Sequence, residues 1–116
     1  DVETLSLVTK LKELLERQHI YREPSLNIGQ LAEQLSVSSG LLSQVINSHF
    51  KKSFRELIND YRIEEAKSAL TNLEYANYTI VAIGLECGFN SKSAFYTAFK
   101  KEMGISPTAF RNQELA

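Results

Sequence analysis

The sequence predicts an all-α protein of about seven helices, in which two similar units of helix, turn and helix flank one long helix. Three observations predict this fold. Apolar residues recur at spacings of three and four along most of the chain. Residues that cap helices precede several of these runs, and the pattern of one half recurs in the other. The 116 residues suffice for one compact domain or two very small subdomains.

The composition supports a folded core and excludes several classes of protein. Hydrophobic residues make up 43% of the chain, and no apolar run approaches the ~20 residues of a membrane span, so we expect no membrane contact here. The one cysteine, Cys87, excludes an internal disulfide and a cysteine-based zinc cage. No metal-ligand set or catalytic pattern stands out, and we predict neither an enzyme nor a cofactor site. Because the chain begins with Asp1 and not Met, we expect it to be part of a longer protein.

The net charge is only −1, but the acidic residues are unevenly distributed. No Asp or Glu occurs from Gln34 to Arg55 or from Cys87 to Lys101, and both segments contain lysines. We therefore expect local positive potential on a nearly neutral molecule. The alternative is two solvated faces with chance runs of charge.

The first helix is predicted over residues 2–20 from a helical repeat of Leu5, Val8, Leu11, Leu14 and Leu15. It should end at residues 21–24, because Pro24 disfavours helical angles in the residue before it. His19 has no second ligand at metal-binding spacing, and we interpret it as a surface or capping histidine.

A short helix, a turn and a second helix follow. Asn27 and Gln30 form a capping box for the short helix, whose buried side comprises Ile28, Leu31, Ala32 and Leu35. Ser36-Val37 makes the turn. Ser38 caps a helix that runs to about His49 and turns inward Leu42, Val45, Ile46 and Phe50.

The other face of this second helix carries small, hydroxyl and amide side chains: Ser39, Gly40, Ser43, Gln44 and Asn47. Amides can bond adenine through two hydrogen bonds, and hydroxyls can bond base edges or phosphates. An ordinary polar helix face has the same composition, so this face alone does not decide between the two interpretations.

A long helix is predicted from Ser53 to Thr71, because Ser53 and Glu56 form a second capping box. Its apolar positions cover more than one stripe, as expected of a helix contacted from both sides: Phe54, Leu57, Ile58, Tyr61, Ile63, Ala66, Ala69 and Leu70. At 1.5 Å per residue this helix is ~28 Å long. Residues 72–78 should form a polar loop.

The second half of the chain repeats the first. Before the turn, Ile28, Leu31 and Leu35 match Ile80, Ile83 and Cys87. After one inserted residue, Leu42, Val45, Ile46 and Phe50 match Phe95, Ala98, Phe99 and Met103, and Ser53 matches Ser106. Both copies have the pattern of a helix-turn-helix, which offers its second helix to the DNA major groove. The duplication makes this weak motif a strong indication.

In the second copy the exposed face of the second helix comprises Lys92, Ser93, Tyr96, Thr97 and Lys100. Lysine can bond guanine or phosphate, and the Tyr96 ring could pack on a sugar or a thymine methyl group. Ser106 should cap a last helix that begins at Pro107. Helix N-termini such as those at Ser53 and Ser106 can bind phosphate through free amides.

These residues resemble the DNA-binding domain of the AraC/XylS family of bacterial transcription regulators over residues 5–112. The resemblance is carried by Leu31-Ala32, 42–46, 61–63 and 66–67, and above all by Ile80, Ala82, Gly88-Phe89, Phe95, Phe99-Lys100, Gly104, Ser106-Pro107 and Arg111. It implies two homeodomain-like helix-turn-helix subdomains. Residues 1–52 would hold the leading helix and the first subdomain, 53–72 the linker helix, and 73–116 the second subdomain with the closing helix.

The resemblance implies sequence-specific binding of double-stranded DNA for transcription regulation, with activation as the expected effect. The recognition helices would be Ser39 to His49 and Lys92 to Glu102, in successive major grooves roughly 34 Å apart. The expected base contacts are Ser39, Gly40, Ser43, Gln44, Asn47, Lys92, Ser93, Tyr96 and Thr97. The expected phosphate contacts are Lys51, Lys52, Ser53, Arg55, Arg62, Lys100, Lys101, Ser106 and Arg111. Because the first recognition helix has no Arg or Lys, we expect the second to discriminate between sequences.

The resemblance also implies RNA polymerase as a partner and an effector or sensor domain outside this fragment. It places the domain in the bacterial cytoplasm or at the cytoplasmic end of a membrane-bound sensor. One alternative is a helical protein–protein interaction module without DNA binding. Another is the AraC-like module of a DNA alkyl-transfer repair protein, which would need a reactive cysteine. Cys87 repeats the buried position of Leu35, which favours an inert thiol.

Overall fold

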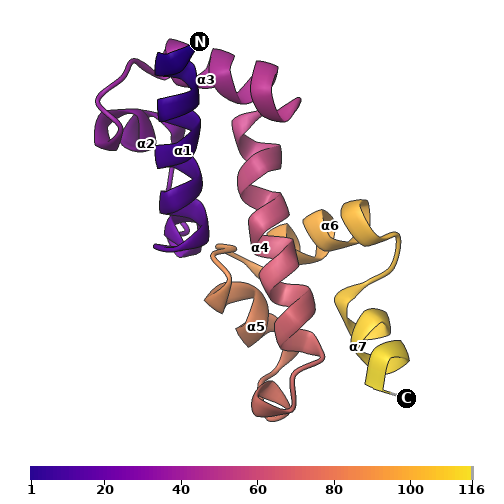
Figure 1. Ribbon diagram of the computed structural model, residues 1–116. Coiled ribbons are helices and arrows are strands. Elements are labelled where there is room, and N and C mark those ends of the chain that lie inside the picture. Colours follow the sequence, from indigo (N-terminus) through magenta and orange to yellow (C-terminus); the bar gives the residue numbers. More distant parts are fainter. Residues whose placement is uncertain (116) are drawn as a thin grey trace. The chain divides into compact units, whose positions relative to one another are not determined.

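Seven α-helices and no β-strand make up residues 1–115, the part of the chain that the computed structural model describes (Figure 1). The order is α1 (Val2–Glu16), α2 (Ile28–Gln34), α3 (Ser39–Val45), α4 (Phe54–Leu70), α5 (Ile80–Glu86), α6 (Lys92–Met103) and α7 (Pro107–Leu115). The chain divides within α4 into a first unit, Asp1–Ile58, and a second unit that starts at Asn59. This all-α architecture confirms the predicted fold class.

The leading helix is shorter than predicted. α1 ends at Glu16, and His19 then adopts a left-handed conformation with φ of 53° before a 3₁₀ turn at Ile20–Arg22 buries Tyr21. Leu5 was expected in the core, but its side chain is 60% exposed, and Leu7 is buried instead. At 100° per residue Leu5 lies roughly 120° from the centre of the stripe formed by the buried residues of α1. A spacing of three from Val8 is therefore not sufficient to place Leu5 in the core.

The helix caps predicted at Asn27 and Ser38 are present, and the second unit has equivalent caps at Thr79 and Ser91, which were not predicted. In the first unit, Asn27 and Gln30 bond each other's backbone amides, and the Ser38 hydroxyl accepts from Leu41. In the second, the hydroxyls of Thr79 and Ser91 do the same for α5 and α6. Each cap satisfies an amide that has no partner within its own helix. The two units therefore begin their paired helices in the same way.

The duplication extends to the backbone of the turns. Ser36, which follows α2, has φ of 59°, and its counterpart Gly88, which follows α5, has φ of 111°. Another left-handed residue comes after the second helix of each helix-turn-helix: Lys51 after α3 and its π-helical turn, and Gly104 after α6. A left-handed residue reverses the chain direction after a helix, and glycine adopts this conformation without a steric penalty. The second unit has glycine at both positions.

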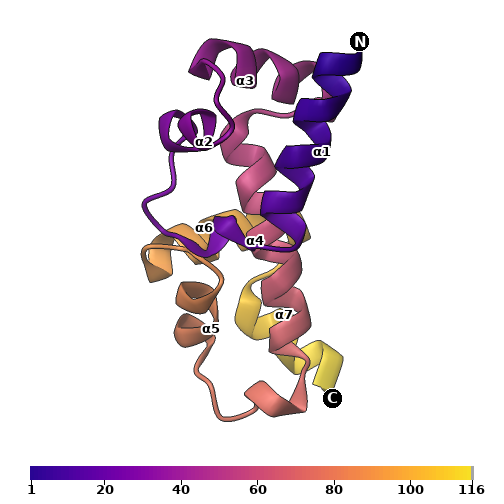
Figure 2. The same cartoon turned by 60° about the vertical axis from the view of Figure 1, so that its left-hand side comes forward.

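The helices α4, α5 and α6, whose ribbons are drawn in Figure 2, contribute residues to the core of the second unit. This core is rich in aromatic residues: Phe95 and Phe99 of α6 are 1% and 0% exposed, and their rings meet at 5.8 Å between centroids. Gly84 of α5 faces Phe95 so closely that a Cβ atom there would lie 2.3 Å from Phe95 Cδ2. The corresponding residue of the first unit is the buried Ala32. The sequence pattern did not reveal that α5 needs a glycine at this point.

Arg111 joins three segments of the second unit. Its Nε donates to the carbonyl oxygen of Leu70 at 3.1 Å, its Nη1 to that of Tyr78 at 2.9 Å and its Nη2 to that of Tyr75 at 2.7 Å. The guanidinium thereby ties α7 to the end of α4 and to the loop at residues 72–78. That loop contains a 3₁₀ turn, Leu73–Tyr75, and presents its carbonyl oxygens to the arginine.

We predict that Gly84→Ala lowers the free energy of unfolding by about 1–3 kcal/mol, because the new methyl group overlaps the Phe95 ring. Urea unfolding followed by circular dichroism measures the change. Gly40→Ala is the matched control, since nothing lies within 4 Å of an added Cβ in α3 and alanine favours helix. The control should unfold at the same or a higher urea concentration. Equal stability of the two variants would contradict the close contact.

We predict that Arg111→Lys also destabilises the second unit, by about 1–3 kcal/mol, because one ammonium group cannot reproduce three diverging hydrogen bonds. Thermal unfolding measures the shift. Arg55→Lys is the control, since Arg55 is exposed on α4 and should tolerate the change. If both variants melt together with the unmodified chain, Arg111 does not hold the three segments.

Candidate nucleic-acid interface

The predicted face of α3 is at the surface. Ser39, Gly40 and Gln44 are exposed and Ser43 is half-buried, while Leu42 and Val45 on the opposite side are buried. The helix presents small and amide side chains, with no acidic residue from Gln34 to Arg55 to repel a phosphate. The face is therefore suited to close approach to DNA.

The first recognition helix does not run as one regular α-helix to His49. α3 ends at Val45, and a single π-helical turn, Ile46–Phe50, continues it, so that Asn47 lies on this turn. The Ser48 hydroxyl donates to the carbonyl oxygens of Gln44 and Val45, a local bond that competes with the regular helix ladder. Lys51 in the left-handed conformation then ends the turn.

Leu41 is an exposed residue of α3 that the sequence interpretation missed. Its side chain is 45% exposed beside Gln44, although the residue is apolar. The signal was present, because Leu41 lies outside the repeat of Leu42, Val45 and Ile46. An exposed leucine on such a helix can contact a thymine methyl group.

The corresponding face of α6 combines cations with hydroxyl groups. Lys92, Ser93, Thr97 and Lys100 are exposed, and Tyr96 is half-buried. The Lys92 ammonium lies 5.3 Å from the centroid of the Tyr96 ring, within the range of a cation–π contact. The Tyr96 hydroxyl shares a hydrogen bond of 3.2 Å with Thr108 of α7. α6 therefore holds a lysine and a tyrosine in contact on one exposed face.

Most of the predicted phosphate contacts are exposed. Lys51, Lys52, Ser53 and Arg55 lie at the surface in the first unit. Lys100 and Lys101 lie at the surface on the last turn of α6, where positive charge also favours the helix dipole. Their exposure makes these side chains accessible to a phosphate.

The two serine caps differ in their suitability for a phosphate. The Ser53 amide donates to the Glu56 carboxylate and the Ser53 hydroxyl accepts from the Glu56 amide, so a negative charge already occupies the start of α4. The half-buried Ser106 hydroxyl accepts from the Ala109 amide, and no acidic residue lies in the first turn of α7. The helix start at Ser106 is thus the more favourable of the two for an anion.

Two arginines expected at phosphates are engaged within the second unit. Arg111 has three donors on backbone carbonyl oxygens, and the half-buried Arg62 lies with its guanidinium 5.7 Å from the centroid of the Phe89 ring. Burial lowers the pKa of Arg62 from its ordinary value, although the group stays charged at neutral pH. Both arginines therefore contribute to the packing of the second unit, and their contact with phosphate stays a prediction.

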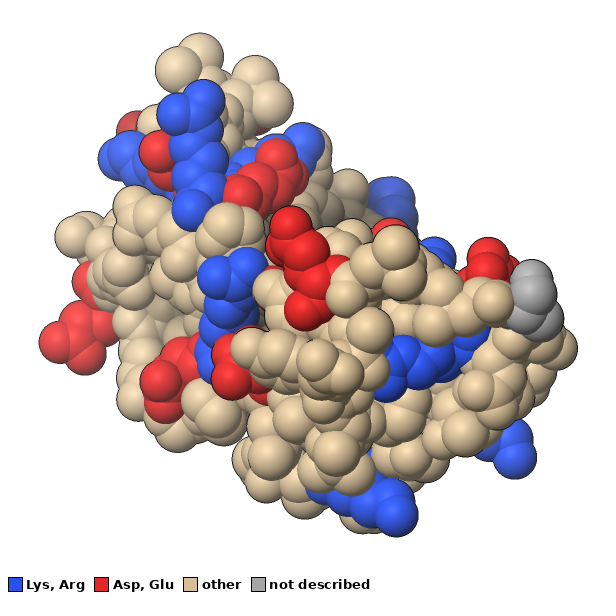
Figure 3. Space-filling view, turned by 90° about the horizontal axis from the view of Figure 1, so that it is seen from below, with Lys and Arg blue, Asp and Glu red and all other residues tan. Residues whose placement is uncertain are grey.

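The surface charges, the one cysteine and the possible metal ligands bear on other kinds of site. On the face drawn in Figure 3, Lys and Arg side chains are interspersed with Asp and Glu. Cys87 is 2% exposed, so its thiol is shielded from a substrate. Within residues 1–115 no group of three or more His, Cys, Asp or Glu could hold a metal ion, and no helix is long and apolar enough to cross a membrane.

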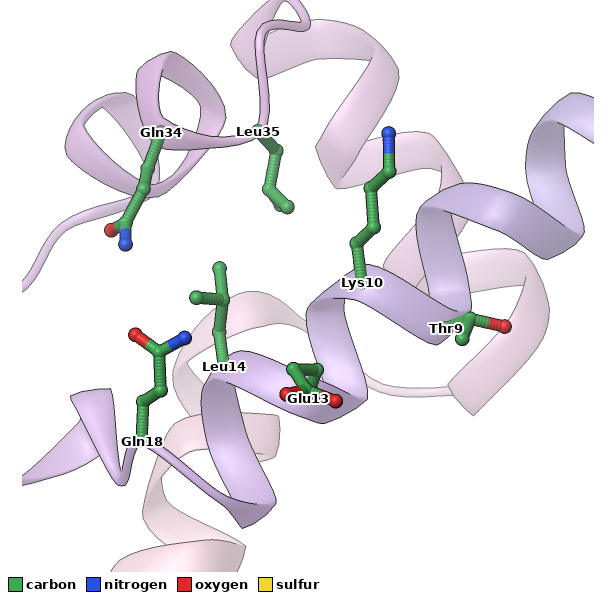
Figure 4. Close-up of a pocket in the computed structure, with 7 residues that line it drawn as sticks. All are labelled: Thr9, Lys10, Glu13, Leu14, Gln18, Gln34 and Leu35. Carbon is green, nitrogen blue, oxygen red and sulfur yellow. The ribbon is translucent and has the colours of Figure 1, made fainter.

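A pocket of about 420 Å³ lies in the first unit between α1 and the end of α2 (Figure 4). Leu14 and Leu35 point toward each other across it, and polar side chains surround them: Thr9, Lys10, Glu13, Gln18 and Gln34. None of the predicted base or phosphate contacts lines this pocket. It is therefore separate from the exposed face of α3.

Comparison with known proteins identifies the fold and the family. A family model described as a helix-turn-helix domain matches residues 31–113. The xylose operon regulatory protein of Haemophilus influenzae is 30% identical over 86 residues, which are 74% of this chain and 21% of that protein. Curated relatives are much longer, and the chain spans from 14% to 37% of the length of the first ones it matches.

Two solved structures are similar over most of the chain. The C-terminal domain of AraT, a response regulator from Geobacillus stearothermophilus, has a TM-score of 0.82 and 31% identity over 92% of this chain and 84% of that one. The C-terminal domain of the two-component response regulator yesN from Fusobacterium nucleatum has a TM-score of 0.73 and 32% identity over 88% and 98%. The chain belongs to the AraC-type family of helix-turn-helix DNA-binding domains of transcription regulators.

Proposed function

We propose that the chain binds a specific sequence in double-stranded DNA by inserting α3 and α6 into successive major grooves, and that it activates transcription. The observation that carries this proposal is the exposed, acid-free face of α6. With 12 residues, or ~18 Å at 1.5 Å per residue, α6 is long enough to lie across several base pairs. Its Lys92, Ser93, Tyr96 and Thr97 supply donors, acceptors and an apolar ring.

α3 contributes a different kind of contact. Its base-contact candidates are Ser39, Gly40, Ser43 and Gln44, with Asn47 on the π-helical turn and Leu41 added from the structure. Gln44 is suited to adenine, and Leu41 to the methyl group of the paired thymine. No lysine or arginine lies on this helix, so its contribution to affinity should be the smaller one.

The contacts with phosphate should set the register of the domain on DNA. We assign this role to the exposed cations Lys51, Lys52, Arg55, Lys100 and Lys101 and to the helix start at Ser106, with Ser53 as a weaker contributor beside Glu56. In this proposal the first subdomain, residues 1–52, and the second subdomain, residues 73–116, both contact bases. Residues 53–72 link the two.

The setting of the domain in a larger regulator is also a proposal. The similar solved domains are C-terminal parts of response regulators, and the similar Haemophilus protein regulates a xylose operon. By that similarity we place this domain beside an effector or sensor domain, in the bacterial cytoplasm, with RNA polymerase as the partner in activation.

A helical module that binds only other proteins is the remaining alternative, and the low net charge of −1 is the observation that favours it. Such a module would keep the fold and lose affinity for DNA. Binding to long duplex DNA at low salt distinguishes the two functions. A DNA-binding domain should bind, because its cations neutralise phosphates, whereas a protein–protein module should not.

We predict that the chain binds duplex DNA with an affinity that falls steeply as salt rises. If the five exposed cations named above each neutralise one phosphate, the logarithm of the binding constant should fall with the logarithm of salt concentration with a slope of about −4.5. Fluorescence anisotropy of a labelled duplex from 50 to 200 mM salt measures it. No binding at the lowest salt would exclude the proposed function.

We predict that substitutions on α6 separate base contacts from phosphate contacts. Lys92→Ala or Tyr96→Ala should weaken a duplex selected from a random library more than a random duplex, by about 1–3 kcal/mol for each lost base contact. Lys51→Ala or Lys101→Ala should weaken both duplexes alike. Lys12→Ala, on the exposed side of α1, is the control and should leave both affinities unchanged. Equal losses for all four interface variants would refute this division of roles.

A further inference from the structure

The side chain of Tyr96 is held by a residue of another helix. Its hydroxyl shares a hydrogen bond of 3.2 Å with Oγ1 of Thr108, the second residue of α7. Both partners can donate or accept, so the pair is satisfied whichever atom carries the shared proton. Thr108 lies outside the recognition helix, and neither the helical repeat nor the exposed face of α6 pointed to it.

Two further contacts fix the Tyr96 ring. Its ring stands edge-to-face with Phe95, with centroids 5.9 Å apart and an interplanar angle of 84°. The Lys92 ammonium lies 5.3 Å from the Tyr96 centroid. Thr108 therefore holds the hydroxyl end of the ring, and the buried Phe95 contacts its side. The ring in turn makes a cation–π contact with Lys92.

Other contacts fix α7 in the second unit, so the position of Thr108, to which Tyr96 is bonded, is also fixed. Phe110 of α7 meets the buried Phe99 with centroids 5.4 Å apart. Arg111 bonds the three carbonyl oxygens at residues 70, 75 and 78. The N-terminal turn that carries Thr108 thus cannot shift without disturbing an aromatic contact and three hydrogen bonds.

The first unit has no counterpart of this arrangement. In the register of the duplication, Lys92, Tyr96 and Thr108 correspond to Ser39, Ser43 and Arg55. No aromatic ring stands at the position of Tyr96 there, and no short hydroxyl side chain at that of Thr108. The arrangement is a feature of the second copy alone.

We propose that Thr108 is a positioning residue for DNA recognition, which acts through Tyr96 to fix where the Lys92 ammonium meets a base. The inference rests on the proposed function of α6. A lysine has a long flexible side chain that loses conformational freedom when it binds. A ring that already restricts this side chain lowers the loss, because preorganised groups bind with a smaller entropic cost. The restriction should raise the affinity for the specific sequence, in which Lys92 contacts one particular base. It should not change the affinity for random DNA, in which Lys92 has no fixed partner.

The test compares Thr108→Val, Tyr96→Phe, the double variant and Thr108→Ser for binding to a selected duplex and to a random duplex. Thr108→Val keeps the shape of the side chain and removes its hydroxyl, and Tyr96→Phe removes the other partner. Each should weaken the selected duplex by about threefold to tenfold, as expected for the loss of one hydrogen bond, and leave the random duplex unchanged. The double variant should be no weaker than either single variant, and Thr108→Ser should bind like the unmodified chain.

Thr9→Val is the matched control, since Thr9 is an exposed helical threonine of α1 whose hydroxyl bonds only its own helix. It should bind both duplexes like the unmodified chain. Thermal unfolding of every variant shows whether a loss of binding follows from a loss of fold. A fall in affinity together with a lower melting temperature in both Thr108→Val and Tyr96→Phe would show a structural role and overturn the proposal.

Two other results would overturn it. If the unmodified chain binds the selected duplex and the Thr108→Val variant binds it equally well, Thr108 does not act on recognition. Additive losses in the double variant would show that the two hydroxyl groups contribute to binding independently, and not through their shared hydrogen bond. If the unmodified chain does not bind DNA, the proposed function is wrong. The role of Thr108, which rests on that function, is then wrong as well.

Discussion

The contact between Gly84 and the ring of Phe95 determines the geometry of the second unit. Because no side chain stands at Gly84, α5 approaches α6 until its backbone lies against the aromatic ring. Phe95 and Phe99 then fill the core, and Phe110 brings α7 against the same cluster. With one side of α6 buried in this way, the opposite side, from Lys92 to Lys100, is necessarily the exposed one.

A chain of nearly neutral charge can offer a DNA-binding surface because the location of its charges matters more than their sum. The two segments without acids coincide with α3 and its following turn and with most of α6. Acidic side chains lie instead on the other helices, at the ends of α5 and α6 and in loops, and several of them cap or pair within helices, as Asp1, Glu56 and Glu64 do. Acids at those positions leave the recognition faces free of repulsion.

The two copies of the helix-turn-helix have diverged in what they can read. α3 has seven residues, ends in a π-helical turn and carries amides, whereas α6 has 12 residues and carries Lys92 and Tyr96 in contact. The closing helix α7 supports α6 through Thr108 and is anchored by Arg111. The second copy thus differs from the first in having its recognition helix α6 held by α7. It is also the copy that we expect to discriminate between sequences.

The sequence by itself determined the all-α class and the caps at Asn27, Ser38 and Ser106, because each follows from residues within one or two helical turns of each other. It also determined the repeat, because the same apolar pattern recurs 52 or 53 residues further along the chain. Tertiary structure decided the partners of Arg111, which lie 33 to 41 residues away, the contact of Tyr96 with Thr108, and the need for glycine at position 84. It also decided which leucines of α1 are buried, placing Leu7 inside and Leu5 outside. Such outcomes depend on where separate helices meet, and the periodicity of a single helix indicates which face is buried but not which residues of another helix it meets.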